Sequence, residues 1–530
     1  MNVAKVKSLS AAKAARLRGL ETHGLVRTQT GYYYIAHYYP LRAMHNVKAK
    51  NASFLVQRMA GSSFETYLHF PFCDIKCSFC HFHKDLVGAD FAIREDNYLN
   101  LVERELDLYG QILGPIKARS FYIGGGTPSV MSNRRLVRLL SKVRDRLEIA
   151  DDAEIKFELF PKMYQAAELD EKLRILRDFG FTDLVIDLES GNQASLNYVG
   201  RRNTSLAAYL QLVSRAIDFG FSSIVTALIP GMPHENLETL EHTLEQLCAI
   251  QQVKIINTFP LIIRKPDAIH RQCLRDPHNF PTALDRDVLW IFARDYLRAK
   301  GFSEGPISYL HRPTKRPEQQ ADKFECVNLL GFGSSAFGYL NSSAWSTQYF
   351  NFCNKEDYAK RILAGELPLW QAGMLDQNER ARRKLIFGLA NCKTENLYDL
   401  ENRFGVSVDA LFGKVLNALL ELELIEIQPG QGIAYTEQGL CRLEEISYFL
   451  GSDYVKDTCA KPIKRDKWYR ERLSHHYYIR IPKLHRRRFE EFIARQPKEF
   501  MKKVSTIDNC HSEFSRVLPP ARYDDHTVRL

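Results

Sequence analysis

The sequence predicts an α/β fold with a parallel β-sheet. Between about residues 154 and 262, short apolar runs alternate with helix-like segments, which is typical of βαβ units with right-handed crossovers. Two of the helix-like segments stop at a glycine, Gly180 and Gly220, as helix C-termini commonly do. The chain has 530 residues, 45% of them hydrophobic, which is enough to bury a large core.

Two strands are expected upstream of this region, each followed by a loop. Residues 66–70 form the first strand, which runs through Pro71 into a cysteine-rich loop. Residues 121–123 form the second strand, and a glycine-rich loop follows it. That loop contains Gly124, Gly125, Gly126 and Thr127. Glycines after a strand let the backbone approach a ligand and present its N–H groups, so this loop is a candidate cofactor-binding loop.

Four more strand-like runs follow in order. They lie in residues 154–161, 182–191, 221–233 and 253–262. Helical patterns occupy the stretches between them, at residues 170–180, 205–220 and 236–250. Six βα units result, and functional side chains are expected at the C-terminal ends of the strands.

Three cysteines spaced C-x3-C-x2-C form the most specific pattern in the chain: Cys73, Cys77 and Cys80. Zinc could take the three thiolates together with His81 or His83. A thiol-exchange pair would need only Cys77 and Cys80, leaving Cys73 unexplained. A [4Fe–4S] cluster would be held by three thiolates with one iron open to a non-protein ligand. The strand before the cysteines and the glycine loop after the next strand favour the cluster.

The segments YLHFPFCDIKCSFC and YIGGGTPS resemble the radical S-adenosylmethionine (SAM) enzymes, specifically the HemN-like group related to oxygen-independent coproporphyrinogen oxidase. The resemblance extends from about residue 66 to about residue 450. It implies a partial (β/α)6 radical SAM barrel. It also implies that the three cysteines bind a [4Fe–4S] cluster and that SAM chelates the open iron.

The resemblance assigns cofactor contacts to individual positions. Glu158 matches a glutamate that contacts the sugar of SAM. Arg201 matches an arginine that pairs with the SAM carboxylate, and Arg202 is the neighbouring alternative. Tyr67 precedes the cluster loop and Phe79 lies within it, both at aromatic positions of the family. For Glu158 and the two aromatic residues, the alternative is a structural role.

Three departures separate the chain from the oxidases of this group. Glu189 stands where they carry a glutamine, and Ala227 stands where they carry an aspartate. His81, Phe82 and His83 follow the last cysteine of the motif, where the oxidases have Gly-Cys. His81, His83 and Glu189 are therefore candidate catalytic residues, the histidines as proton shuttles or as donors to a cluster sulfur.

The resemblance implies one of two reactions. In the oxidase branch, a 5′-deoxyadenosyl radical takes hydrogen from a porphyrinogen propionate, which then loses carbon dioxide. In the methylating branch, two SAM molecules bind instead of one, and a methyl-derived carbon adds to an sp² centre, giving methylation or cyclopropanation. The three departures and the segment YPLRAM at residues 39–44 favour the methylating branch. A non-catalytic haem-binding or zinc-stabilised protein is the alternative of another class, although the His-Asn-x-x-Tyr-Trp signature of the haem chaperones is absent.

Five segments are expected along the chain. They are an approach segment (1–60), the radical SAM barrel (61–270), a barrel-completing segment with a glycine-rich cover (271–375), a small winged-helix-like domain (376–450) and a basic extension (451–530). A winged helix invites a DNA-binding interpretation. The third helix of this one carries Asp409, Glu421 and Glu423 against only Lys414, which is the wrong sign for a phosphate-facing element.

Composition limits the remaining possibilities. The formal charge of +10 is moderate for this length and does not by itself indicate nucleic acid. The basic, aromatic-rich extension is interpreted as helix and loop packed on the preceding domain, with an acidic substrate, a carrier protein or RNA as alternatives. A small-molecule substrate and an electron donor such as flavodoxin or ferredoxin are the expected partners. Scattered cysteines and the lack of a long apolar run predict a cytoplasmic protein without membrane contact.

Overall fold

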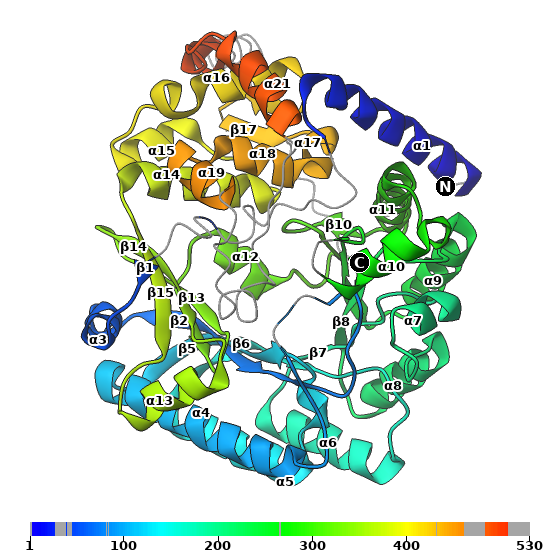
Figure 1. Cartoon of the computed structure of the whole chain (residues 1–530), viewed down its shortest axis with the longest axis vertical. Coiled ribbons are helices and arrows are strands. Elements are labelled where there is room, and N and C mark those ends of the chain that lie inside the picture. Colours follow the sequence, from blue (N-terminus) through cyan, green and yellow to red (C-terminus); the bar gives the residue numbers. More distant parts are fainter. Residues whose placement is uncertain are drawn as a thin grey trace, which may run out of the picture.

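The computed structural model describes residues 3–26, 39, 45–80, 82, 84–263, 267–430, 432–460 and 483–506. A curved sheet of thirteen strands forms its centre, with helices along its outer face (Figure 1). No helix within these residues is both long enough and apolar enough to cross a membrane.

Six parallel strands form the middle of the sheet, in the same order in space as in the chain. They are β2 (Ser63–Phe70), β5 (Ile116–Gly125), β6 (Leu147–Glu158), β7 (Asp183–Val185), β8 (Ser223–Leu228) and β9 (Val253–Thr258). All five pairings between neighbours are parallel. The predicted partial barrel of six βα units is confirmed, and the sheet stays open.

The outer face of these strands is covered by the crossover helices. They are α4 (Phe91–Leu113), α5 (Asn133–Arg146), α6 (Ala166–Phe179), α8 (Leu206–Asp218) and α9 (Leu237–Ala249), with the short α7 (Gln193–Tyr198) before α8. Helix α6 ends as the sequence predicted, because Gly180 adopts the left-handed conformation (φ 106) and its N–H bonds to the carbonyl groups of Leu176 and Arg177. Leucines on the inner faces of these helices pack against the strands in one continuous core.

Both edges of the parallel sheet are extended by later parts of the chain. Strands β11 (Tyr309–His311) and β10 (Ser303–Glu304) add antiparallel to β9. Strand β12 (Leu329–Phe332) adds parallel to β2. Beyond β12 come β13 (Phe337–Asn341), β14 (Ser346–Asn351), β15 (Leu369–Leu375) and β1 (His45–Asn46), each antiparallel to its neighbour. Half of the glycine-rich segment 325–340 is thus part of the sheet.

Helices connect these added strands. They are α3 (Ala49–Gln57), α10 (Ala268–Arg275), α11 (Ala283–Ala299), α12 (Glu318–Phe324) and α13 (Lys355–Leu363), and two short strands, β3 (Phe72–Cys73) and β4 (Asp85–Leu86), pair beside the cysteine loop. Helix α12 lies near the middle of the concave side of the sheet (Figure 1).

The C-terminal part has a separate core. Its elements are α14 (Gln377–Ala390), α15 (Leu397–Phe404), α16 (Val408–Glu421), the hairpin β16 (Ile425–Gln428) and β17 (Gly432–Tyr435), α17 (Glu437–Cys441), α18 (Leu443–Leu450), α19 (Asp453–Ala460) and α21 (Lys483–Ala494). Three helices followed by a hairpin is the order expected of a winged helix, and the domain assignment itself stays a prediction.

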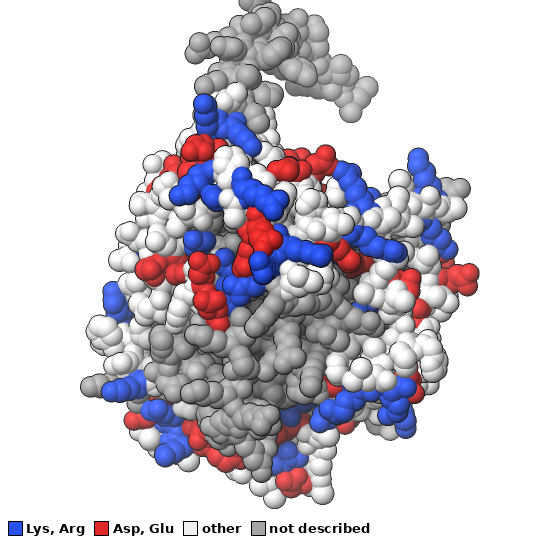
Figure 2. All heavy atoms as spheres, turned by 45° about the horizontal axis from the view of Figure 1, so that its top comes forward, with Lys and Arg blue, Asp and Glu red and all other residues white. Residues whose placement is uncertain are grey.

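The described part of the basic extension packs on α16. The side-chain amide of Asn417 donates to the carbonyl oxygen of Pro497 (2.9 Å), and Asp409 accepts from the backbone N–H of Phe500 (2.8 Å). Gly413 is needed there, since a Cβ atom would lie 1.8 Å from the Lys498 oxygen. Acidic and basic side chains are intermixed on this face of the molecule (Figure 2). Residues 461–482 and 507–530 lie outside the described residues.

Helix α1 (Val3–Gly19) links the barrel to the C-terminal part. The Lys13 ammonium group contacts Asp295 of α11 at 2.9 Å and Glu437 of α17 at 2.8 Å. Ser10 donates to Asp295 as well, at 2.8 Å. The contacts join three segments that are far apart in the chain.

Candidate active site

A cavity of about 440 Å³ lies at the C-terminal ends of the parallel strands. It brings together most of the site residues that were predicted from the sequence. These are Tyr67, Cys73, Cys77, Phe79, Cys80, Gly125, Gly126, Thr127, Glu158, Glu189 and Arg201. Gly124 adjoins them, since a Cβ atom there would lie 2.5 Å from Glu158 Oε1. His81 and His83 lie outside the described residues, and their proposed roles stay predictions.

The cysteine loop is tied to its surroundings through the backbone. Ser78 donates to the carbonyl oxygen of Val199 (2.9 Å), and Val87 donates to that of Cys73 (3.0 Å). Burial raises the pKa of the Cys73 thiol to about 12, with Lys84 acting in the opposite direction. Such thiols become thiolates when a cation binds them, because a metal ion deprotonates its thiol ligands outright. At neutral pH the Cys73 thiol would ionise only with such a cation bound.

The glycine-rich loop lies directly against the segment that carries the cysteines. Gly126 and Thr127 donate to the carbonyl oxygens of Phe70 and Phe72, both at 2.7 Å. A Cβ atom on Gly126 would lie 2.5 Å from the Phe72 oxygen. One on Gly125 (φ 113) would lie 2.3 Å from the His69 ring. Only glycine fits these two positions, so the sequence signal has a local steric cause.

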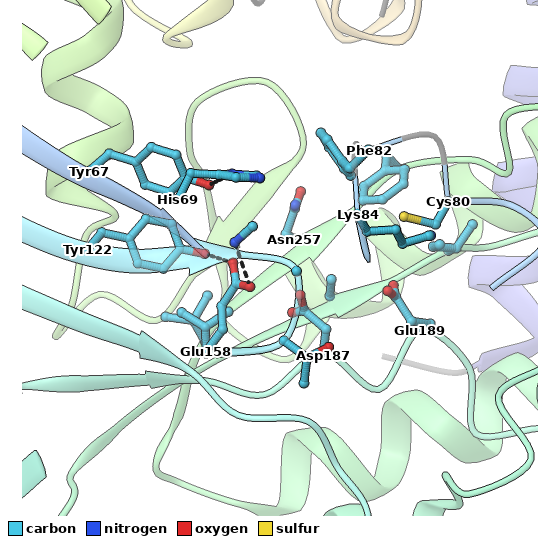
Figure 3. A pocket seen from close by; sticks show the side chains of 18 of the residues that line it. Tyr67, His69, Cys80, Phe82, Lys84, Tyr122, Glu158, Asp187, Glu189 and Asn257 are labelled. Carbon is cyan, nitrogen blue, oxygen red and sulfur yellow. Dashed lines mark hydrogen bonds between the residues drawn. The ribbon is translucent and has the colours of Figure 1, made fainter. Parts of the chain in front are cut away.

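Three acidic side chains line the cavity where β6 and β7 end (Figure 3). Glu158 accepts hydrogen bonds from the Tyr122 hydroxyl group and from the Gly125 N–H (3.1 Å). Burial raises the pKa of Glu158 and of Glu189 to about 8, and that of Asp187 to about 6. The raised values follow from crowding carboxyl groups in a poorly hydrated space. A cationic ligand at this position would favour their ionised forms.

Arg201 is the cationic partner of this acidic row. Its Nη1 lies 3.6 Å from Glu189 Oε1, its Nη2 donates to the Asp187 carbonyl oxygen (2.6 Å), and its guanidinium group covers the Phe160 ring at 4.7 Å. Among the described residues, Arg201 Nε and Glu189 Oε2 are buried without a hydrogen-bond partner. Arg202, the neighbouring alternative, is exposed. The structure thus places Arg201 at the cavity, with a buried Nε atom that could donate to a ligand carboxylate.

Several cavity residues escaped the sequence analysis. Asp187 could have been found, since it precedes Glu189 by two residues at the end of a strand-like run. His69 follows the same rule, two residues after Tyr67, whose hydroxyl group lies 2.9 Å from its Nδ1. No pattern in the sequence marked Lys323 as a cavity residue, because α12 reaches the cavity through tertiary packing.

These features fit a [4Fe–4S] cluster and SAM. Three thiols line one cavity, as three cluster ligands must. Arg201 offers a guanidinium group to the carboxylate group of an amino acid such as the methionine part of SAM. The cysteines would hold the cluster, and the strand ends would hold SAM.

Comparisons with known proteins agree with this chemistry. The family model "Radical SAM superfamily" matches residues 67–247. The chain is 24% identical to the haem chaperone HemW of Bacillus subtilis, over 73% of this chain and 98% of that protein. It is also 24% identical to an oxygen-independent coproporphyrinogen III oxidase of Cereibacter sphaeroides, over 66% of this chain and 78% of the oxidase.

A solved structure shares the fold. The coproporphyrinogen III oxidase HemN of Escherichia coli superposes with a TM-score of 0.69 at 20% identity, covering 80% of this chain and all of that one. The family expected from the cysteine and glycine motifs is therefore confirmed. Residues 67–247 thus form a radical SAM domain, the chain has HemN-like and HemW-like relatives, and this family implies a [4Fe–4S] cluster and SAM.

Proposed function

We propose that this protein is a methylating radical SAM enzyme, which adds a carbon unit from SAM to an unsaturated carbon of a small substrate and uses two SAM molecules per turnover. Glu189 is the observation that carries the proposal. Its carboxyl group is buried in the cavity, its pKa is about 8, and Arg201 lies 3.6 Å away. When the methyl-derived carbon of the second SAM adds to an sp² centre, S-adenosylhomocysteine leaves, the reductant supplies a second electron, and the hydrogen of that centre is lost as a proton. A carboxyl group that titrates near neutral pH suits that task.

Two further features of Glu189 and its neighbour support the proposal. Glu189 adopts a left-handed backbone conformation (φ 69), which is uncommon outside glycine and tends to occur at functional sites. Its N–H donates to the Ala227 carbonyl oxygen at 2.8 Å, so the two departures from the oxidase pattern adjoin each other. The Ala227 side chain gives the cavity an apolar surface where an aspartate would add a fourth acidic side chain to Glu158, Asp187 and Glu189.

The protein's own groups would divide the work as follows. When bound, the cluster and SAM supply one-electron cleavage of a C–S bond and the carbon radical that results. Cys73, Cys77 and Cys80 hold the cluster. Glu158 and Arg201 hold the polar groups of SAM in place. Glu189 accepts the proton that the substrate loses.

The experiment that tests the proposal is anaerobic. The cluster is reconstituted and reduced, SAM is added, and the nucleoside products are identified by mass spectrometry. 5′-Deoxyadenosine together with S-adenosylhomocysteine would show that two SAM molecules serve different purposes and would support methylation. 5′-Deoxyadenosine alone would contradict it.

Oxygen-independent coproporphyrinogen oxidation is the second candidate. The similarity to the Cereibacter sphaeroides oxidase over 78% of that protein favours it. Loss of carbon dioxide from coproporphyrinogen, with 5′-deoxyadenosine as the only nucleoside product, would establish this activity. Haem carriage, suggested by the name of the Bacillus subtilis relative, would instead give stoichiometric haem binding without SAM cleavage.

A further inference from the structure

We propose that the part of the cavity across from the cysteines binds a planar, unsaturated acid, with Lys323 as the residue that recognises its anionic group. The inference rests on the proposed function, because it names the class of substrate that the methylating site would take. It is carried by two neighbouring features, an aromatic wall on the sheet and the cavity-facing side of α12.

The aromatic wall consists of four rings from β5, β2, β13 and β14: Tyr122, Tyr67, Phe337 and Phe350. Their centroids follow one another at 5.5 Å, 6.2 Å and 5.9 Å, all in tilted arrangements. The wall begins at the cofactor end of the cavity, where Tyr122 donates to Glu158 (Figure 3). Rings at these spacings offer one extended apolar surface to a flat ligand.

Helix α12 supplies the polar end of this surface. Gln319, Gln320, Lys323 and Phe324 line the cavity. The Lys323 ammonium group lies 5.6 Å from the centroid of Phe337 and 5.2 Å from that of Phe324. A lysine over aromatic faces keeps a cation beside an apolar wall, which is the arrangement needed to bind an aromatic acid.

The polar groups of α12 are held in place from the sheet. The Gln319 N–H donates to Glu154 Oε2 at 3.1 Å, and its side-chain amide donates to the Thr66 carbonyl oxygen at 3.3 Å. Gln319 is 6% exposed, and its Oε1 has no hydrogen-bond partner in the described part of the chain. A buried acceptor in this position is available to a donor on the ligand.

A ligand anion would also favour the ionised form of Lys323. Burial lowers the pKa of Lys323 to about 7, and Glu444 of α18 acts in the opposite direction. A ligand carboxylate beside the ammonium group would restore its charge and offset the cost of burying both groups. The cavity volume of about 440 Å³ is near the lower end of the range for drug-sized ligands, roughly 300–1,000 Å³. Since SAM must share this space, one or two fused rings suit it better than a macrocycle.

The test uses 2-naphthoate and 2-naphthamide, which have the same shape and differ in charge. Both are titrated calorimetrically into the anaerobic protein with its cluster reconstituted and SAM bound, without reductant. We expect naphthoate to bind about tenfold more tightly, equivalent to about 1.4 kcal/mol. Lys323→Met should remove that preference and leave naphthamide binding unchanged. Lys360→Met, at an exposed lysine of α13, should change neither affinity.

Three results would overturn the inference: no binding of either probe, equal binding of the two by the unaltered protein, or an unchanged preference in Lys323→Met. Lys323→Arg should keep the preference if charge is what matters. Phe337→Leu should weaken the binding of both probes equally, because it removes one ring from the aromatic wall. No turnover is needed, so a negative result here leaves the nucleoside products unaffected. Absence of S-adenosylhomocysteine would likewise refute methylation without touching the binding data.

Discussion

The side-chain amide of Asn351 donates a hydrogen bond of 2.9 Å to the buried carboxyl group of Glu105, 246 positions earlier in the chain. The same carboxyl group accepts from the Gly333 N–H (2.7 Å) and the Tyr358 hydroxyl group (2.6 Å). Glu105 of α4 thus connects three elements by hydrogen bonds: the turn between β12 and β13, the strand β14 and the helix α13. These bonds stabilise the position of the added strands that carry Phe337 and Phe350.

Stability should fall with rising pH because of Glu105. Burial raises its pKa from 4.5 to about 7, so the folded protein keeps a proton that the unfolded chain releases. The stabilising contribution is full below about pH 4.5 and is lost as pH rises to about 7. Glu105→Gln should reduce the fall in unfolding free energy over this window by up to about 3 kcal/mol.

Urea unfolding at several pH values between 4.5 and 8 measures this effect. Glu103→Gln, on the same helix but partly exposed, is the matched control and should keep the slope of the unaltered protein. Parallel curves for all three proteins would show that Glu105 does not titrate in the window.

The three motif cysteines should be required for the cluster, and other cysteines should not. Replacing Cys73, Cys77 or Cys80 by alanine removes one thiolate from the set that lines the cavity, so the broad iron–sulfur absorption and SAM cleavage should both disappear. Cys248→Ala, at a thiol of α9 outside this set, should retain both. Cleavage that survives the loss of Cys77 would disprove the assignment.

Gly126→Ala should damage the site through sterics alone. The added methyl group would lie 2.5 Å and 2.7 Å from two backbone oxygens, which cannot move as a side chain can. We expect about 1–3 kcal/mol of destabilisation and a loss of SAM binding, as overpacking commonly causes. Gly19→Ala meets no atom within 4 Å and serves as the control. Thermal unfolding and calorimetric titration of SAM read out the two effects, and equal behaviour of both variants would contradict the prediction.

Asp287→Ala should loosen the C-terminal part from the barrel. Arg442 is 1% exposed and its Nη2 lies 3.0 Å from Asp287 Oδ2, so the substitution leaves a buried guanidinium group without its carboxylate. Removing one partner of a buried ion pair costs about 3–5 kcal/mol. Glu491→Gln, which breaks an exposed pair with Arg487, should cost little. Chemical denaturation compares the two, and a small effect of Asp287→Ala would show that the pair is dispensable.

Local signals in the sequence were sufficient for the parallel strands and for many of the residues that line the cavity. The glycines at 124–126 and the cap at Gly180 are fixed by sterics within a few residues, so their pattern predicts their structure. Long-range pairing leaves no such pattern. Strand β12 joins β2 across more than 250 residues, and Lys323 reaches the cavity on a helix whose Gln319 bonds to the distant residues Glu154 and Thr66. Residues of this kind could not be inferred from neighbours in the chain.

The contacts of α1 have a consequence for biosynthesis. Lys13 is made 282 residues before its partner Asp295, and Glu437 follows later still. At about 5–20 residues per second, the helix waits roughly 15–55 s on the ribosome for the first of these partners. A single helix of 17 residues is marginally stable in water during that wait. The segment translated early therefore becomes ordered late. The contacts of Lys13 with Asp295 and Glu437 can form only after both the barrel and the C-terminal part have been synthesised.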